Sequence, residues 1–170
     1  MLIRHRRIKT LLPVIFLLST LFPLDAAATD RSESAPEKAG TYECAPTRPD
    51  MKGPFYKKDA PVRAVIGEGY LLRGTVRSAV DCAPVPGAPI EFWMAGPDGE
   101  YTDDYRATVI SDAGGQYRLT SHFPPGYMGR PPHVHIRVAA NGFRTLITQH
   151  YPRGGSESGE FDLVLIPEQP

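Results

Sequence analysis

Glycine and proline interrupt this sequence so often that they leave little room for long helices. The 170 residues include 16 Gly and 18 Pro, and from Gly53 onward these residues separate short apolar stretches. Proline removes a helical hydrogen bond, and glycine loses more backbone entropy on folding than any other residue, so both disfavour helix interiors. A chain with this pattern is expected to fold mainly as short strands joined by turns.

Seven stretches have the residue composition of β-strands. They are residues 70–76, 88–94, 107–110, 116–120, 133–139, 143–151 and 161–166. Turn-forming residues separate them, and the turn at 112–115 predicts a hairpin between its two flanking strands. About seven to eight short strands, with no stretch of helical periodicity after the N-terminal region, predict an all-β fold, an antiparallel β-sandwich in one domain.

The first 28 residues have the pattern of a secretory signal peptide. Basic residues at positions 4–9 precede an apolar run at 11–24, and the Ala-Ala-Ala sequence at 26–28 provides a cleavage site. The run is short and contains two prolines, which argues against a membrane span, although an uncleaved anchor is the alternative. We therefore expect an exported protein, periplasmic or secreted, and both the general secretory and the twin-arginine routes stay open.

Residues 29–43 are polar, have no periodicity and are expected to form a flexible tail, so the folded domain should span residues 44–170. Removal of residues 1–28 takes four Lys or Arg and one Asp from a chain with no net charge, which leaves a mildly acidic protein. The basic residues form no stripe, which argues against a nucleic-acid partner. We expect no membrane association after cleavage, and homo-oligomer formation stays open.

The chain contains two cysteines, Cys44 and Cys82. In an oxidising compartment a lone pair of cysteines forms a disulfide by default, and two separate free thiols are the alternative. A bond between Cys44 and Cys82 would close a loop of about 38 residues and stabilise the fold by about 3–4 kcal/mol in the chain-entropy model. The expected export of the protein favours the disulfide.

The strongest local pattern for chemistry is the pair His133 and His135. Side chains alternate along a strand, so both imidazoles and Arg137 are expected on one face, with the intervening apolar residues in the core. Two imidazoles on one face of a rigid strand can chelate a metal ion. Taken alone, however, an H-x-H pair more often consists of solvated or hydrogen-bonded surface histidines.

The residues just upstream favour a metal site at this pair. Tyr127 and Arg130 lie in a Gly-rich loop, and Pro131-Pro132 restrict the backbone that follows. A zinc site would need a third ligand at a recognisable spacing, and His150 is the geometric candidate. A tyrosinate ligand suits a hard trivalent ion instead, because only a strong Lewis acid keeps a phenol deprotonated at neutral pH.

The residues that lead to His135, with P-x-x-Y at 124–127 followed by R-P-x-H-x-H at 130–135, resemble the signature of the intradiol ring-cleavage dioxygenases. This family includes protocatechuate 3,4-dioxygenases and catechol 1,2-dioxygenases. Four further motifs resemble the family in the same order along the chain: GPFY at 53–56, PVPGAPIEFW at 84–93, DGEY at 98–101 and TQHY at 148–151. The resemblance runs from about residue 44 to residue 167.

The resemblance implies a non-haem Fe(III) cofactor and a set of site residues. The iron ligands fall on Tyr101, Tyr127, His133 and His135, and the active-site arginine and glutamine fall on Arg130 and Gln149. Tyr127 falls on the tyrosine that leaves the metal and takes a proton from the substrate. The implied reaction is intradiol cleavage of a small aromatic diol by O2, which gives a muconate-type diacid.

The chain also departs from these relatives. It has no room for the helical N-terminal region of catechol 1,2-dioxygenases, and only Met128 and Gly129 separate Tyr127 from Arg130, where protocatechuate enzymes have a longer stretch. It looks most like the short, exported branch of the family. The shorter stretch changes the expected pocket wall and therefore the substrate, but not the ligand set.

Two other functions compete with this interpretation. Residues 72–119 resemble transthyretin-like and carboxypeptidase-regulatory-like modules, non-catalytic β-sandwiches that need neither an H-x-H pair nor paired tyrosines. A zinc or copper protein is the third candidate. Of the remaining residues, Trp93 is expected in the core and His122 in a structural role, and His150 is expected to border the pocket as a specificity residue.

Overall fold

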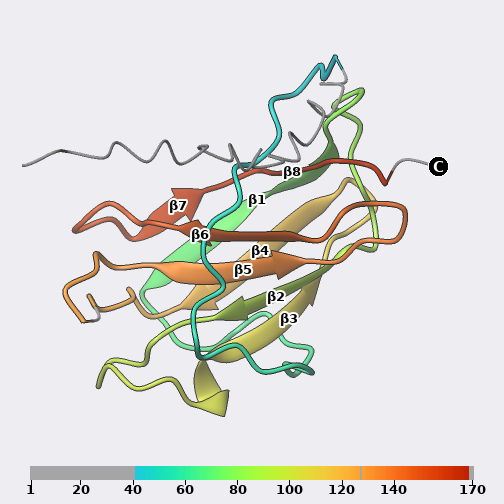
Figure 1. The fold of residues 1–170 in the computed structure, drawn as a ribbon. Helices are drawn as coiled ribbons and strands as arrows, with labels where there is room; N and C mark the ends of the chain where they lie inside the picture. Colours follow the sequence, from blue (N-terminus) through green and yellow to red (C-terminus); the bar gives the residue numbers. More distant parts are fainter. Residues whose placement is uncertain (1–40, 127, 169–170) are drawn as a thin grey trace, which may run out of the picture. The chain divides into compact units, whose positions relative to one another are not determined.

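The computed structural model describes residues 41–126 and 128–168. The predicted signal peptide at 1–28 and most of the predicted tail at 29–43 lie outside the described residues. Within the described ranges the chain is almost entirely β-structure, as predicted (Figure 1). The elements are β1 (Tyr70–Ser78), β2 (Pro89–Trp93), the 3-10 helix η1 (Asp103–Tyr105), β3 (Arg106–Ile110), β4 (Gln116–Ser121), β5 (Val134–Val138), β6 (Leu146–His150), β7 (Ser158–Glu160) and β8 (Leu163–Leu165).

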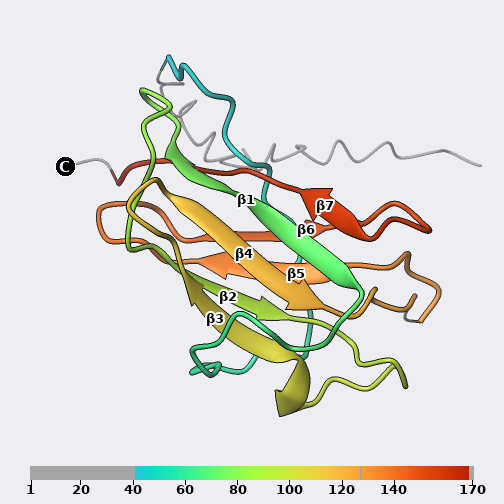
Figure 2. The ribbon, with the colours of Figure 1, turned by 180° about the vertical axis from the view of Figure 1, so that it is seen from behind.

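The strands form two sheets that pack as a sandwich (Figures 1 and 2). One sheet has the order β4-β1-β7, with β8 also paired to β1, and the other has the order β3-β2-β5-β6. The predicted antiparallel pairing holds except where β1 pairs with β7 and with β8, because those two pairs are parallel. No helix within the described residues has the length and apolarity needed to cross a membrane.

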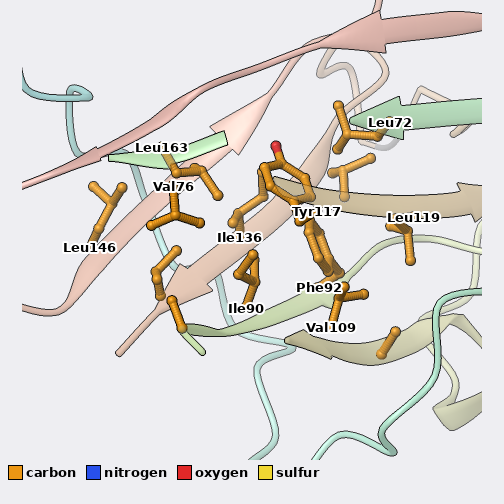
Figure 3. Close-up of a cluster of buried hydrophobic side chains, with 14 of the residues drawn as sticks. Leu72, Val76, Ile90, Phe92, Val109, Tyr117, Leu119, Ile136, Leu146 and Leu163 are labelled. Atoms are coloured by element: carbon orange, nitrogen blue, oxygen red, sulfur yellow. The ribbon is translucent and has the colours of Figure 1, made fainter. Parts of the chain in front are cut away.

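Apolar side chains from the inner faces of both sheets meet in one core (Figure 3). Leu72 of β1 and Leu119 of β4 come from one sheet, and Ile90 of β2, Phe92 of β2 and Ile136 of β5 come from the other, all without solvent exposure. The alternation expected along the stretches 88–94 and 133–139 thus separates a core side from an outer side in β2 and β5.

One prediction about the strands is wrong, and one strand is missing from the predicted set. The turn at 112–115 forms, with the Gly115 N–H donating to the Asp112 carbonyl at 2.9 Å, but it does not close a hairpin. Instead β3 pairs with β2 and β4 pairs with β1, so the turn carries the chain from one sheet to the other. Strand β7 was not predicted, because its sequence Ser-Gly-Glu has no strand-forming residue.

Residues 44–56, called here the N-terminal strap, pass β8 and then run across the outer face of the β3-β2-β5-β6 sheet (Figure 1). Backbone N–H groups fix the strap at intervals, for example Thr47 to the Val164 carbonyl at 3.1 Å and Asp50 to the Ile147 carbonyl at 2.9 Å. The predicted Cys44–Cys82 disulfide is present, with the two Cα atoms 5.3 Å apart, and it ties the start of the strap to the turn that follows β1. The strap therefore covers the face on which His135 was predicted to lie.

Candidate metal centre

Strand β5 places His135 on the outer face of its sheet, and the alternate apolar residues of β5 fill the core as predicted. Trp93, its cross-strand partner on β2, stacks on the imidazole with ring centroids 5.0 Å apart and an interplanar angle of 5°. Gly53 of the N-terminal strap also packs against the ring, since a Cβ there would lie 3.0 Å from His135 Cε1. The imidazole is thus confined by an indole ring and by the strap backbone.

His133 is buried just ahead of β5, and its two ring nitrogens have different partners. Nδ1 lies 2.8 Å from the Pro131 carbonyl oxygen. A carbonyl can only accept, so in the neutral ring Nδ1 carries the hydrogen and Nε2 keeps its lone pair. Nε2 lies 3.3 Å from the Tyr101 hydroxyl. Metal-binding histidines commonly donate their other N–H to a backbone carbonyl in this way.

Tyr101 reaches His133 from the loop between β2 and η1. Its ring stacks on Phe55 of the N-terminal strap, with centroids 4.3 Å apart and an interplanar angle of 10°, and it lies 6.0 Å from the His135 ring. The fold therefore brings Tyr101, which is 32 residues before His133 in sequence, beside the two predicted histidine ligands. Tyr127 lies outside the described residues, so its role stays a prediction.

Burial favours the neutral form of both imidazoles. Burial lowers the pKa of His135 to about 4, and the neighbouring His133 adds to the effect. Burial also lowers the pKa of His133 from its ordinary value, although the hydrogen bond to the Pro131 carbonyl opposes this shift. Neutral imidazoles offer lone pairs to a metal ion without first losing a proton.

The donor set fits a trivalent iron better than zinc. It consists of two neutral imidazoles beside a phenol, and phenolate oxygen is a ligand that hard trivalent ions favour. Within residues 41–126 and 128–168, no group of three or more His, Cys, Asp or Glu side chains is arranged to hold a metal ion. The candidate metal ligands that the described residues bring together therefore include a tyrosine.

The predicted active-site arginine and glutamine lie beside the histidines. Gln149 of β6 is directly opposite His135 in the sheet and shares its face. Arg130 Nη2 donates to Gln149 Oε1 at 2.8 Å, and Arg130 Nη1 lies 3.4 Å from His133 Nε2. Gln149 Nε2 donates to the Met51 carbonyl at 2.5 Å, so the strap fixes the glutamine.

The prediction that His150 borders the pocket is wrong. His150 pairs with Val134 in the sheet register and so lies on the core side, opposite to Gln149. Its Nε2 atom lies 2.8 Å from the Tyr70 hydroxyl in a buried contact. For the same reason it cannot supply the third ligand of a zinc site. His122 is also elsewhere, with Nε2 2.9 Å from the Ala95 carbonyl.

Several residues at the site were not identified from the sequence. Trp93 is buried as predicted, but it packs on His135 instead of in the sandwich core. The Tyr151 hydroxyl lies 3.0 Å from Arg130 Nη2 and donates to Asp50 Oδ2 at 2.9 Å. Strand alternation could have indicated Tyr151, two residues beyond Gln149. No sequence signal points to Asp50.

Replacing Gly53 with alanine is expected to weaken iron retention. Gly53 has φ +71°, where an L-residue loses about 1–2 kcal/mol, and the new Cβ would lie 3.0 Å from His135 Cε1. Gly142→Ala is the matched control, because Gly142 has φ +79° but open space around its Cβ position. Urea unfolding and iron content per chain measure the two effects. Equal iron content in both variants would mean that Gly53 does not confine His135.

Comparison with known proteins places the chain beside ring-cleaving dioxygenases. It is 36% identical over 143 residues to a chlorocatechol 1,2-dioxygenase of Pseudomonas sp. strain P51, covering 64% of this chain and 57% of the relative. It is 33% identical over 157 residues to a hydroxyquinol 1,2-dioxygenase of Rhodococcus opacus, covering 73% and 52% respectively. The chain thus spans little more than half the length of these curated relatives. No protein-family model matches the sequence.

Among solved structures, the chain is similar to the dioxygenase domain of a dioxygenase carbohydrate-binding protein fusion from Streptomyces sp. SirexAA-E. The two superpose with a TM-score of 0.66 at 28% identity, over 73% of this chain and 100% of that domain. The similarity therefore extends to a dioxygenase domain that the present chain covers from end to end.

Proposed function

The chain belongs to the family of intradiol ring-cleavage dioxygenases, and on that premise we propose that it opens the ring of a catechol-type aromatic with O2 at a non-haem Fe(III). The observation that carries the proposal is the 3.3 Å approach of the Tyr101 hydroxyl to His133 Nε2. A transthyretin-like binding module has no need to hold a phenol against a buried, neutral imidazole. The geometry therefore favours the dioxygenase over the binding module.

Tyr101, His133 and His135 would hold the iron, with Tyr127 as the fourth proposed ligand. Bound Fe(III) would draw electron density from a deprotonated catechol and so make its ring reactive towards O2. The reaction breaks the bond between the two hydroxyl-bearing ring carbons, and both oxygen atoms of O2 enter the diacid product.

The protein groups around the metal ligands have separable tasks. Arg130 is permanently cationic and stands 3.4 Å from His133 Nε2, so it can stabilise negative charge that develops beside the metal. Gln149 orients Arg130 through its Oε1 atom, and it is itself held by the Met51 carbonyl. Trp93 stacks on the His135 ring and so fixes the orientation of that ring.

We also propose that the protein is exported to the periplasm or the medium. The signal-peptide pattern at 1–28 supports this, and so does the Cys44–Cys82 disulfide, because structural disulfides persist in oxidising compartments. The substrate would then be an extracellular or periplasmic aromatic diol.

Iron-loaded protein is expected to be reddish, from charge transfer between tyrosinate and iron, and to consume O2 as it converts a catechol to a muconate. Catechol, a chlorocatechol and hydroxyquinol are suitable probes, followed by O2 electrode and by product absorbance. Tyr101→Phe should weaken or shift the visible band and lower turnover, because it removes a proposed ligand.

Tyr105→Phe is the control for this experiment, because Tyr105 lies in η1 and its ring packs on His122 away from the metal ligands. A colourless protein that takes up no iron would favour the binding module. Uptake of zinc or copper in place of iron would favour the third candidate function.

A further inference from the structure

We propose that Asp50 and Tyr151 are positioning residues that hold the Arg130 guanidinium beside the metal ligands. The proposal rests on the function proposed above, since it assigns to Arg130 a task in that reaction. It adds two residues that the family resemblance does not assign, one from the N-terminal strap and one from just beyond β6.

Arg130 is held by neutral groups. Its Nη2 atom donates to Gln149 Oε1 at 2.8 Å and to the Tyr151 hydroxyl at 3.0 Å. Among the described residues, five ion pairs form, and none of them includes Arg130. A long, rotatable side chain with no carboxylate partner keeps one position only if its acceptors are themselves fixed.

Asp50 fixes the hydroxyl of Tyr151. That hydroxyl has a single hydrogen and two acceptors at 2.9 Å, Asp50 Oδ2 and Gln149 Oε1. The hydrogen goes to Asp50, because a carboxylate is the stronger acceptor and Gln149 Oε1 already accepts from Arg130. The oxygen lone pairs of Tyr151 then face the guanidinium.

The pKa shifts agree with this direction of donation. Burial, followed by the hydrogen bond to Asp50, raises the pKa of Tyr151, so the phenol stays protonated and remains a donor. Burial alone would raise the pKa of Asp50, but hydrogen bonds from Met51 and Tyr151 outweigh it and the pKa is lowered, so Asp50 stays an anion.

The N-terminal strap fixes Asp50 in turn. The Asp50 N–H donates to the Ile147 carbonyl on β6 at 2.9 Å. The Met51 N–H donates to Asp50 Oδ1 at 2.6 Å, and the Met51 carbonyl accepts from Gln149. Two adjacent strap residues thus hold both acceptors of Arg130.

In this arrangement the Tyr151 hydroxyl lies between the negative charge of Asp50 and the guanidinium of Arg130. Arg130 is half-buried, and the charge of Asp50 offsets part of its desolvation cost without forming a direct ion pair that would occupy the guanidinium. Arg130 Nη1 stays 3.4 Å from His133 Nε2, where its positive charge can stabilise negative charge that develops in the proposed reaction. A shift of the guanidinium would change how close the cation stands to the reacting groups.

Tyr151→Phe is expected to lower kcat by about 10-fold or more, the scale of a lost hydrogen bond to a charged group, with little change in KM or iron content. Asp50→Ala should act in the same direction, and Asp50→Asn should restore part of kcat because it keeps an acceptor for Tyr151. In an Arg130→Ala background, Tyr151→Phe should have almost no further effect on kcat.

A second measurement does not depend on turnover. Nitrogen-15 NMR of protein loaded with diamagnetic Ga(III) reports rotation of each guanidinium. We expect slow rotation of Arg130 that becomes fast in Tyr151→Phe. Arg137, which is paired with Glu91 at 2.6 Å, is the internal reference and should not change.

The outcomes are distinguishable. Unchanged Arg130 rotation in Tyr151→Phe, or an equal loss of kcat with and without Arg130, would overturn the positioning role. Loss of iron in Tyr151→Phe would also overturn it, since that result would assign Tyr151 to the metal site itself. Changed rotation in a protein that cleaves no catechol would uphold the contact and reject the proposed function.

Discussion

Replacing His133 with alanine is expected to abolish iron binding and to lower ring cleavage roughly a thousandfold or more. Its Nε2 atom is the lone-pair nitrogen that faces the Tyr101 hydroxyl at 3.3 Å, so the substitution removes a proposed ligand and not only a buried side chain. A catalytic metal supplies several kcal/mol of transition-state stabilisation, and about 1.4 kcal/mol corresponds to a factor of ten in rate.

The matched control is His122→Gln. His122 is a second partly buried histidine, but its Nε2 atom contacts the Ala95 carbonyl, and glutamine keeps a donor there. Iron stoichiometry, the visible absorption band and the rate of muconate formation should all fall in His133→Ala and stay near wild type in His122→Gln. Far-UV circular dichroism separates loss of the ligand from loss of the fold. A His133→Ala protein that keeps its iron would contradict the proposed ligand set.

Local patterns predict every strand except β7, and they predict the face of the histidine pair. Side chains alternate along β5, so the sequence around His135 determines which side chains face the core. The same rule, applied in the observed register, corrects the prediction for His150, which lies on the other face from its neighbour Gln149. Gln149 and His150 are adjacent in sequence, but strand alternation places their side chains on opposite faces, so only one of them lies at the site.

Pairing between strands could not be predicted in the same way. The turn at 112–115 has the residues of a hairpin turn, yet β3 and β4 go to different sheets. The pairing partner of a strand depends on burial of its whole apolar face, and a four-residue turn does not determine that partner.

The contacts of the N-terminal strap are the part of the site that is least predictable from the sequence. Asp50 and Tyr151 are 101 residues apart, and Met51 and Gln149 are 98 apart. Met51 acts through its backbone carbonyl, which no residue type encodes. The GPFY motif at 53–56 was recognised without a role, and the structure supplies one, since Gly53 packs on His135 and Phe55 stacks on Tyr101.

Because the strap organises the site, the disulfide at its start should matter for stability and for iron retention. We expect the double substitution Cys44→Ser and Cys82→Ser to lower the free energy of unfolding by about 3–4 kcal/mol, from the 38 residues that separate the cysteines in sequence. Urea unfolding with linear extrapolation measures this difference.

The effect on iron follows from the same geometry. Without the bond, the strap is fixed by backbone contacts such as Thr47 to Val164 and Asp50 to Ile147, which open more often in a less stable chain. Asp50, Met51 and Gly53 would then leave their contacts for part of the time, so iron should dissociate faster into a chelator. Reductant should reproduce the change in the wild-type protein and have no effect on the double variant. A loss of stability without faster iron release would mean that the strap stays in place through its other contacts, and that the disulfide acts only on the unfolded chain.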